Sequence, residues 1–291
     1  MDACFIANQQ IRAEFVELGA ELRRFQPIQG PDLLWSGDPE VWGRVSPVLF
    51  PIVGQLKGDV LRHGGKAFSM GRHGFARDRA FKLMRLNREA CTWMLRDDDQ
   101  SRDQFPFPFE LWITYSVEGP VLKAVYEIRN PGKEPLPASL GAHPAFRWPL
   151  AGGQREAHRL VFAKPESAPI SRVSEGLLDT HPYPNPVDGT VLKLRDDLFT
   201  RDALIFDQLQ SRSLRYVAPG ALGIEFGWEG FQQLGIWTKP GSDFLCIEPW
   251  AGMASPADFD GEFTSKPGIF SVEPGGRRFF RWSARVLPLN S

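Results

Sequence analysis

Apolar and polar residues alternate along several stretches of the chain. The clearest stretch is 121–129, in which every second residue on one face is apolar, namely Leu122, Ala124, Tyr126 and Ile128. Stretches 111–117 and 280–286 repeat the pattern. A period of two is typical of a strand with one buried face and one solvent-facing side. The pattern therefore predicts three long, half-buried strands.

Shorter β-rich runs, each bounded by Gly, Pro, Asp or Ser, occur at 160–162, 214–217, 224–226 and 244–247. No segment carries an apolar stripe of helical spacing over three turns. Many short strands without intervening helices favour an antiparallel sandwich or barrel. We expect an all-β fold, a large antiparallel β-sandwich, in a single domain over residues 1–291. The Pro-rich stretch 165–188 is expected to be a long surface connection.

Composition narrows the classes of partner. The chain has 34 basic and 35 acidic residues and a net charge of −1, which argues against nucleic acid or an anionic membrane as a partner. Three widely spaced cysteines without C-x-x-C spacing argue against a zinc ribbon or a disulfide framework. Neither a signal sequence nor about 18 uninterrupted apolar residues is found. We expect a cytoplasmic protein with a small polar partner.

Three short polar segments interrupt this apolar pattern, at 72–78, 141–146 and 246–250. They supply two imidazoles, His73 and His143, and one carboxylate, Glu248. Histidine and glutamate are the side chains whose pKa values are most easily tuned toward neutrality, and proton transfer between two oxygens needs an acid and a base of this kind. The three residues are therefore candidates for acid–base catalysis.

The order of these segments resembles the aldose 1-epimerase (galactose mutarotase) family, and within it the shorter, LacX-like branch. The resemblance spans nearly the whole chain and rests on Trp35 and on segments 47–54, 73–78, 141–146, 235–238 and 247–250. In that family the fold is a large antiparallel β-sandwich with an open sugar cleft. The resemblance thus implies the same fold as the alternation pattern.

The resemblance also implies a reaction, the interconversion of the α and β anomers of a hexose. Glu248 would be the base at the C1 hydroxyl and His143 the acid at the ring oxygen, while His73 would assist by hydrogen bonding. Neither cofactor nor metal is expected, the partner is a small sugar, and the family is often monomeric. A carboxylate and an imidazolium a few ångströms apart should each favour the charged form of the other.

Three further residues are candidate sugar contacts. Arg77 offers N–H groups that suit vicinal hydroxyls, although it is equally able to hold its own loop through Asp78. Asp202 stands where the family places a sugar-binding aspartate. Trp237 is either a wall against the apolar face of a pyranose or a core residue.

Several alternatives stay open at this point. The long galactose mutarotases carry an Asn-Arg pair where this chain reads 54–59, so the resemblance does not fix the hexose. Arginines near the site favour a hexose 6-phosphate as a second substrate class. A non-catalytic carbohydrate-binding protein, a metal site made of two His and one Glu, and a glycoside hydrolase are further alternatives. The chain has no H-E-x-x-H motif for the metal site and only one nominated carboxylate for the hydrolase.

Overall fold

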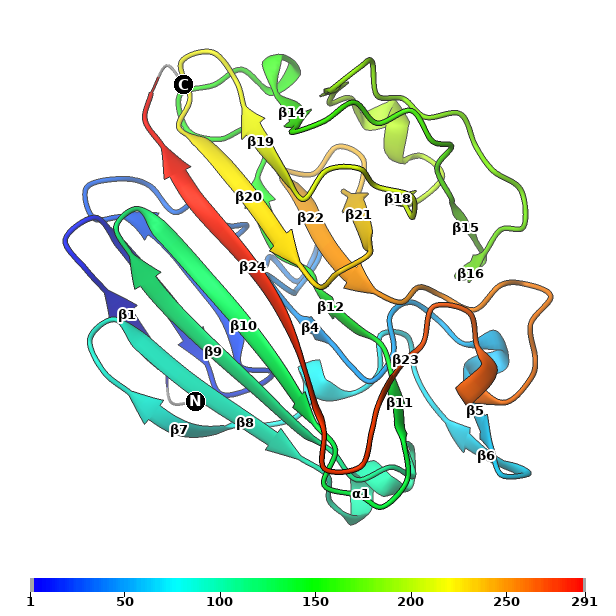
Figure 1. Cartoon of the computed structure of the whole chain (residues 1–291). Coiled ribbons are helices and arrows are strands. Elements are labelled where there is room, and N and C mark those ends of the chain that lie inside the picture. Colours follow the sequence, from blue (N-terminus) through cyan, green and yellow to red (C-terminus); the bar gives the residue numbers. More distant parts are fainter. Residues whose placement is uncertain (1–2, 290–291) are drawn as a thin grey trace.

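The computed structural model describes residues 3–289, and its largest element is a nine-stranded antiparallel sheet (Figure 1). The strand order is β17-β14-β19-β20-β24-β10-β9-β8-β7. The strands are β7 Lys82–Leu86, β8 Ala90–Arg96, β9 Glu110–Glu118, β10 Val121–Arg129, β14 Arg159–Phe162, β17 Val191–Lys193, β19 Ser213–Val217, β20 Gly223–Glu229 and β24 Arg277–Leu287.

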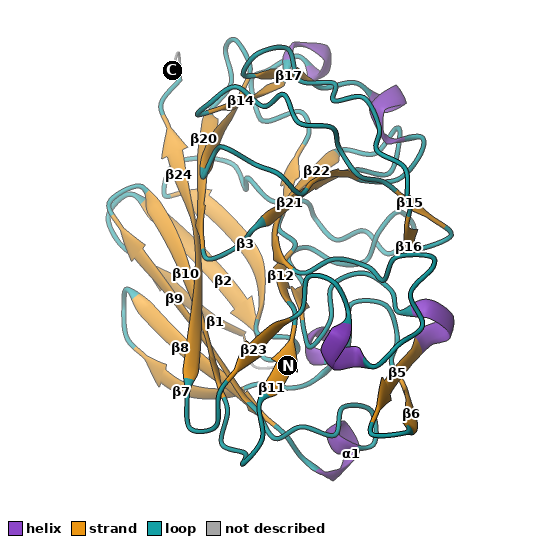
Figure 2. Ribbon diagram, turned by 45° about the vertical axis from the view of Figure 1, so that its right-hand side comes forward, coloured by secondary structure: helices purple, strands orange, loops and turns teal. Residues whose placement is uncertain are grey.

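A second, six-stranded sheet faces the first. Its order is β18-β21-β22-β12-β4, with β13 also paired to β22. The strands are β4 Val48–Leu49, β12 Leu140–Ala142, β13 Ala145–Arg147, β18 Leu204–Phe206, β21 Gln233–Trp237 and β22 Phe244–Ala251. Figure 2 shows the two sheets as separate layers, with the longer loops on the far side of the smaller sheet.

The remaining elements are small. A three-stranded sheet (β1 Ala3–Ala7, β2 Ile11–Val16, β3 Glu21–Pro27) and three two-stranded pairs (β5 Val60–His63 with β6 Lys66–Ser69, β11 Leu136–Ala138 with β23 Phe270–Val272, β15 Val173–Ser174 with β16 Leu177–Leu178) complete the strands. The helices are α1 Asp99–Arg102 and the 3-10 turns η1 Lys57–Asp59, η2 Ala76–Asp78, η3 Arg155–Ala157, η4 Asp196–Phe199 and η5 Phe263–Ser265. Within residues 3–289, none of the helices has the length and apolar character needed to span a membrane.

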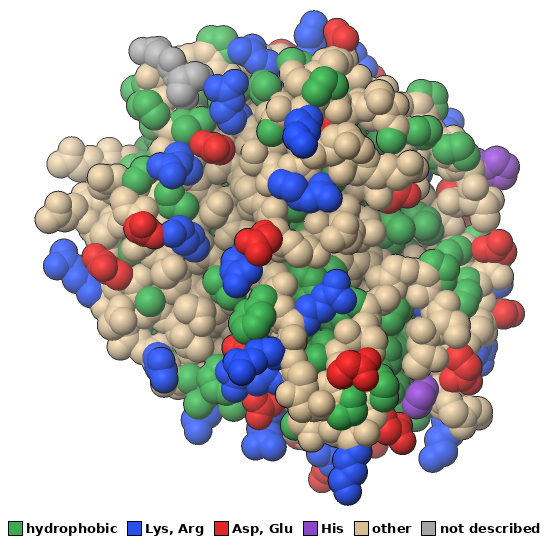
Figure 3. Space-filling model, in the orientation of Figure 1, with side chains coloured by type: hydrophobic (Ala, Val, Ile, Leu, Met, Phe, Trp, Pro, Cys, Tyr) green, Lys and Arg blue, Asp and Glu red, His purple; other side chains and the backbone are tan. Residues whose placement is uncertain are grey.

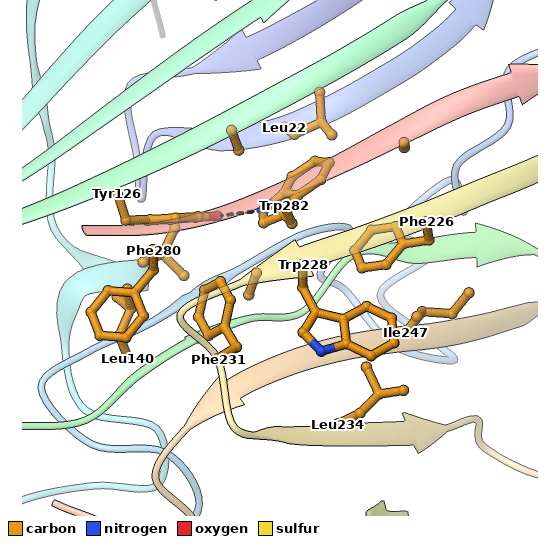
Figure 4. Close-up of a cluster of buried hydrophobic side chains, with 14 of the residues drawn as sticks. Leu22, Tyr126, Leu140, Phe226, Trp228, Phe231, Leu234, Ile247, Phe280 and Trp282 are labelled. Carbon is orange, nitrogen blue, oxygen red and sulfur yellow. Dashed lines mark hydrogen bonds between the residues drawn. The ribbon is translucent and has the colours of Figure 1, made fainter. Parts of the chain in front are cut away.

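The main hydrophobic core fills the space between the two large sheets (Figure 4). Trp282 on β24 and Phe226 on β20 stack with ring centroids 5.5 Å apart, and they face Ile247 on β22. The indole N–H of Trp282 donates a hydrogen bond of 3.0 Å to the hydroxyl of Tyr126. Because the polar atoms of these two rings satisfy one another, both are buried without a desolvation penalty.

The strand predictions are confirmed. The alternating stretch 121–129 coincides with β10, and stretches 111–117 and 280–286 lie inside β9 and β24. The all-β class follows from these sheets. The Pro-rich stretch 165–188 does contain a long connection, but it also folds into the β15–β16 hairpin, which the repeated prolines concealed.

The surface reflects the near balance of charge. On the face shown in Figure 3, basic and acidic side chains are scattered and intermixed rather than gathered by sign. Opposite charges often meet in exposed pairs, such as Arg281 with Glu229 at 2.7 Å. Pairs of this kind add little stability, since water screens them.

Candidate functional site

A cavity of about 190 Å³ lies against the face of the six-stranded sheet that points away from the main core. Along β22, Leu245 and Ile247 point into the core, whereas the alternate side chains of Glu248 and Trp250 line the cavity. Because side chains alternate between the two faces of a strand, the same strand that contributes to the core also places the carboxylate of Glu248 on the outer face of the sheet. The predicted strand ended at Ile247, but β22 continues to Ala251, so Glu248 lies inside the strand.

His143 and Glu248 meet because of strand register. β22 pairs Cys246 with Ala145 and Trp250 with Gly141, so continuing the same register across the gap between β12 and β13 sets residue 143 opposite residue 248. The Nε2 atom of His143 lies 3.1 Å from the Oε2 atom of Glu248. Both side chains are buried, at 7% and 1% exposure. This distance allows a proton to pass directly between them.

The indole ring of Trp250 forms the floor of the cavity and needs a glycine on each neighbouring strand. A Cβ atom on Gly235 would lie 2.5 Å from the ring, and one on Gly141 would lie 2.8 Å from it. Real Cβ contacts at these distances are too short, so any side chain would displace the ring. The glycines of the sequence segments around His143 and Trp237 thus have a packing role.

His73 is fixed by a reciprocal contact with Gly54. The amide of His73 donates to the carbonyl of Gly54 at 2.7 Å, and the amide of Gly54 donates to Nδ1 of His73 at 3.1 Å. Nδ1 therefore accepts, and the ring proton of neutral His73 is on Nε2. His73 has a φ of 66°, a left-handed conformation that is uncommon for a residue other than glycine. Such strain often marks functional positions.

Two tryptophans enclose His143. The ring of Trp42 stacks on the imidazole, with centroids 5.0 Å apart, and the ring of Trp237 meets it edge-on at 6.0 Å. Trp237 is half-buried and lines the cavity, and its role as a wall against a pyranose ring stays a prediction. Sequence reasoning missed Trp42, because it lies in a loop between turn residues with no strand or motif to mark it.

Arg77 and Arg72 lie at one side of the cavity. A terminal N–H of Arg77 donates to the backbone carbonyl of Arg72 at 2.7 Å, whereas its Nε atom lies 3.7 Å from Asp78. Asp78 is closer to Arg44, at 2.6 Å. Arg77 thus holds its loop through a carbonyl more than through Asp78, and it still presents its side chain to the cavity.

Asp202 also lines the cavity, together with residues of the Pro-rich connection. Its φ is 63°, and its carboxylate accepts a 2.7 Å hydrogen bond from the amide of Ala203. Val173 and Gly176, from the β15–β16 hairpin, also line the cavity. No sequence pattern marks these two residues, because strands of two residues are too short to show an alternation of apolar and polar positions.

Burial opposes the charge on both central groups. Burial is the main cause that lowers the pKa of His143 to about 3, and burial, followed by the charge of Asp202, raises the pKa of Glu248 well above its ordinary value. Burial, with His143 and two arginines nearby, also lowers the pKa of His73. Burial therefore favours the neutral form of both groups, whereas the sequence led us to expect that the carboxylate and the imidazolium would each favour the charged form of the other.

A metal ion has one possible set of ligands at this site. The thiol of Cys246, which lies on the same side of β22 as Glu248, brings a sulfur within 4.8 Å of ligand atoms of Glu248 and His143. Burial and the neighbouring Glu248 raise the pKa of this thiol, which disfavours the thiolate that a metal requires. The candidate ligand set within residues 3–289 is therefore His143, Cys246 and Glu248, whereas the alternative considered from the sequence was two His and one Glu.

Comparison with known proteins identifies the family of this chain. The profile of the aldose 1-epimerase family matches residues 3–271. The protein LacX of Lactococcus lactis subsp. lactis is 32% identical over 282 residues, covering 92% of this chain and 94% of LacX.

Two solved structures share the whole fold. A galactose mutarotase related enzyme from Lactobacillus acidophilus has a TM-score of 0.91 and 28% identity, covering 99% of this chain and 98% of its own. A galactose mutarotase-like protein from Lactobacillus casei has a TM-score of 0.91 and 26% identity, covering 98% of this chain and all of its own. The chain therefore belongs to the aldose 1-epimerase family of isomerases.

Proposed function

We propose that this protein interconverts the α and β anomers of a hexose, with Glu248 as the base and His143 as the acid. The observation that carries the proposal is the pair itself, 3.1 Å apart and buried against a cavity walled by Trp42 and Trp237. Anomer interconversion needs a base that removes a proton from the C1 hydroxyl and an acid that adds one to the ring oxygen, and the pair offers one group of each kind. Family membership supports the reaction class.

Glu248 and His143 together can supply and take up every proton that the reaction moves. Because burial favours both neutral forms, the resting pair holds one proton between Glu248 and His143. Moving that proton to His143 gives an ionised base and a charged acid with no net change. Glu248 then takes the C1 hydroxyl proton, His143 protonates the ring oxygen, and the bond between C1 and that oxygen breaks. Rotation about the C1–C2 bond and the reverse steps give the other anomer.

The remaining candidate residues are assigned to sugar binding. The Nε2 proton of His73 is free to donate to a sugar oxygen, since its Nδ1 atom is bound to Gly54. Arg77 and Asp202, which both line the cavity, supply a donor and an acceptor. Trp237 offers an apolar surface to the pyranose ring.

A hexose 6-phosphate is the second candidate substrate class, and Arg72 favours it. Its exposed guanidinium lines the cavity and contacts the side-chain oxygen of Gln55 at 3.1 Å. Within residues 3–289, no carboxylate lies within 4.0 Å of it in an ion pair. An arginine without a carboxylate partner is suited to bind a phosphate.

Anomerisation rates test the proposal. Freshly dissolved α-D-glucose, α-D-galactose and α-glucose 6-phosphate would be followed by NMR or polarimetry with the wild type, His143→Asn and Glu248→Gln. We expect acceleration that both substitutions abolish, and the ranking of the sugars gives the substrate class. Sugar binding without acceleration would instead identify a binding protein.

Further expectations belong to the same proposal. Activity that survives dialysis against a chelator, with no metal in the purified protein, would support a metal-free mechanism. We also propose a single-domain, cytoplasmic monomer. Light scattering of the eluted protein measures the mass directly, and a mass of twice 32.7 kDa would contradict the monomer.

A further inference from the structure

The guanidinium of Arg172 faces one turn of backbone, residues 198–203. Its Nη2 donates to the carbonyl of Leu198 at 2.9 Å, and its Nη1 donates to the carbonyl of Asp202 at 2.8 Å. Nη1 has two longer contacts, with the carbonyls of Ala203 at 3.4 Å and Arg201 at 3.5 Å. One side chain thus gathers four carbonyl groups of a single turn.

In these contacts the positively charged guanidinium of Arg172 binds backbone carbonyl oxygens rather than a carboxylate. Within the part of the chain that the structure describes, no carboxylate forms an ion pair with Arg172. The turn follows η4, where carbonyl groups lack partners within the helix. A cation at that end of a helix compensates the exposed carbonyl dipoles.

The turn carries Asp202 in a left-handed conformation. Its φ of 63° is uncommon for residues other than glycine, although aspartate adopts it more readily than most. In this conformation the carboxylate bonds the amide of Ala203 and lines the cavity. The bond from Arg172 to the carbonyl of Asp202 acts on the same residue.

Arg172 also immediately precedes the β15–β16 hairpin, which lines the same cavity. Its neighbour Ser171 exchanges two backbone hydrogen bonds with Ile205, at 2.8 and 3.1 Å. The next residue, Val173, lines the cavity. Arg172 therefore joins the β15–β16 hairpin to the turn that carries Asp202.

We propose that Arg172 is a positioning residue, which holds the Asp202 carboxylate at the cavity and so fixes where it meets the sugar hydroxyls. The sugar contact rests on the proposed function. The placement of Asp202 relative to Glu248 does not, because both residues are part of the sugar-free protein.

The test compares Arg172→Met with a matched control, Arg195→Met. Arg195 lies at the start of η4, but its side chain pairs with Asp197 on the surface. We expect Arg172→Met to raise KM roughly tenfold and change kcat less than about threefold, since it removes binding more than chemistry. Arg195→Met should match the wild type. Arg172→Lys, which can still reach one or two carbonyls, should fall between them.

A second readout uses the sugar-free protein. The pKa of Glu248 is measured by NMR titration of carbon-13-labelled glutamate carboxyls. Because the charge of Asp202 raises this pKa, a displaced Asp202 should lower it in Arg172→Met. The titratable and charged groups that surround Glu248 are His143, His73, Arg72, Arg77, Asp202 and Cys246.

A double variant that also carries Asp202→Asn tests whether Arg172 acts on Glu248 through the charge of Asp202. In the Asp202→Asn background, Arg172→Met should have no further effect on the pKa of Glu248. A shift that persists there, or wild-type KM and pKa values in Arg172→Met, would overturn the proposal. If Arg172→Met does not fold, Arg172→Lys is carried through the same comparison. If the wild type accelerates no hexose, the proposed function fails while the pKa readout still decides the role of Arg172.

Discussion

Replacing Glu248 with glutamine separates catalysis from stability. Glutamine keeps the size of the side chain but cannot accept a proton at neutral pH. Glu248 is the only carboxylate within 4.0 Å of His143 in residues 3–289, so no other group on that side can take over as base. Loss of a general base lowers the rate by about 10²–10⁴-fold, or roughly 3–5 kcal/mol of activation free energy. We expect kcat to fall by that factor.

The same substitution should leave the stability nearly unchanged, unlike most substitutions at buried positions. Since burial disfavours the charge of Glu248, an uncharged isostere removes no favourable ionic interaction. We expect the free energy of unfolding, measured with urea, to change by less than about 0.5 kcal/mol. Rates would come from polarimetry on the preferred sugar.

Glu166→Gln is the matched control. Glu166 is buried at 4% exposure, and its two oxygens accept hydrogen bonds from the amides of Gln210 and Ser211 at 3.0 and 2.7 Å. Glutamine leaves one of those amides facing an NH₂ group, which costs about 1–3 kcal/mol of stability. Its kcat should equal that of the wild type. A Glu248→Gln protein with kcat within threefold of wild type, or one as destabilised as Glu166→Gln, would refute the reasoning.

Three more predictions concern the packing and the histidines. Gly235→Ala forces a Cβ against Trp250 and should lower the urea unfolding free energy by about 1–3 kcal/mol, whereas Gly71→Ala, with no atom within 4 Å, should change it little. His158 is buried, with both ring nitrogens bonded to backbone, and burial lowers its pKa. Its neutral form therefore stabilises the fold above about pH 6.5, and this stability is lost as the pH falls toward the lower folded pKa. Thermal melts between pH 7 and 5 should show a weaker pH dependence in His158→Gln, and an unchanged slope would contradict this. Trp42→Leu removes the ring that stacks on His143 and exposes its imidazole to water. The pKa of His143 should therefore rise toward its ordinary value in an NMR titration. A further decrease of this pKa would count against the stacking argument.

The sequence was a better guide to the strands than to the walls of the cavity. The period of two marks β10 and β9 because each has one buried face and nine residues in which to repeat. Cavity-lining residues that come from loops and turns, among them Trp42 and Gly176, show no such repeat. Their positions depend on contacts between residues that are far apart in the sequence. His143 and Glu248 could be nominated from the sequence, but the effect of burial on their pKa values could not, because desolvation depends on the packed structure.

The register that sets His143 opposite Glu248 also constrains the length of the chain. Removing or adding one residue between Gly141 and Ala145 would shift the pairing of this segment with β22 by one residue and turn the shifted side chains to the other face, so the imidazole would lose its place opposite Glu248. Neighbouring side chains can repack around a substitution in residues 141–145, but repacking cannot correct a change in the length of this segment. In descendants of this sequence that keep the acid–base pair, insertions and deletions should collect in the outer loops and avoid residues 141–145.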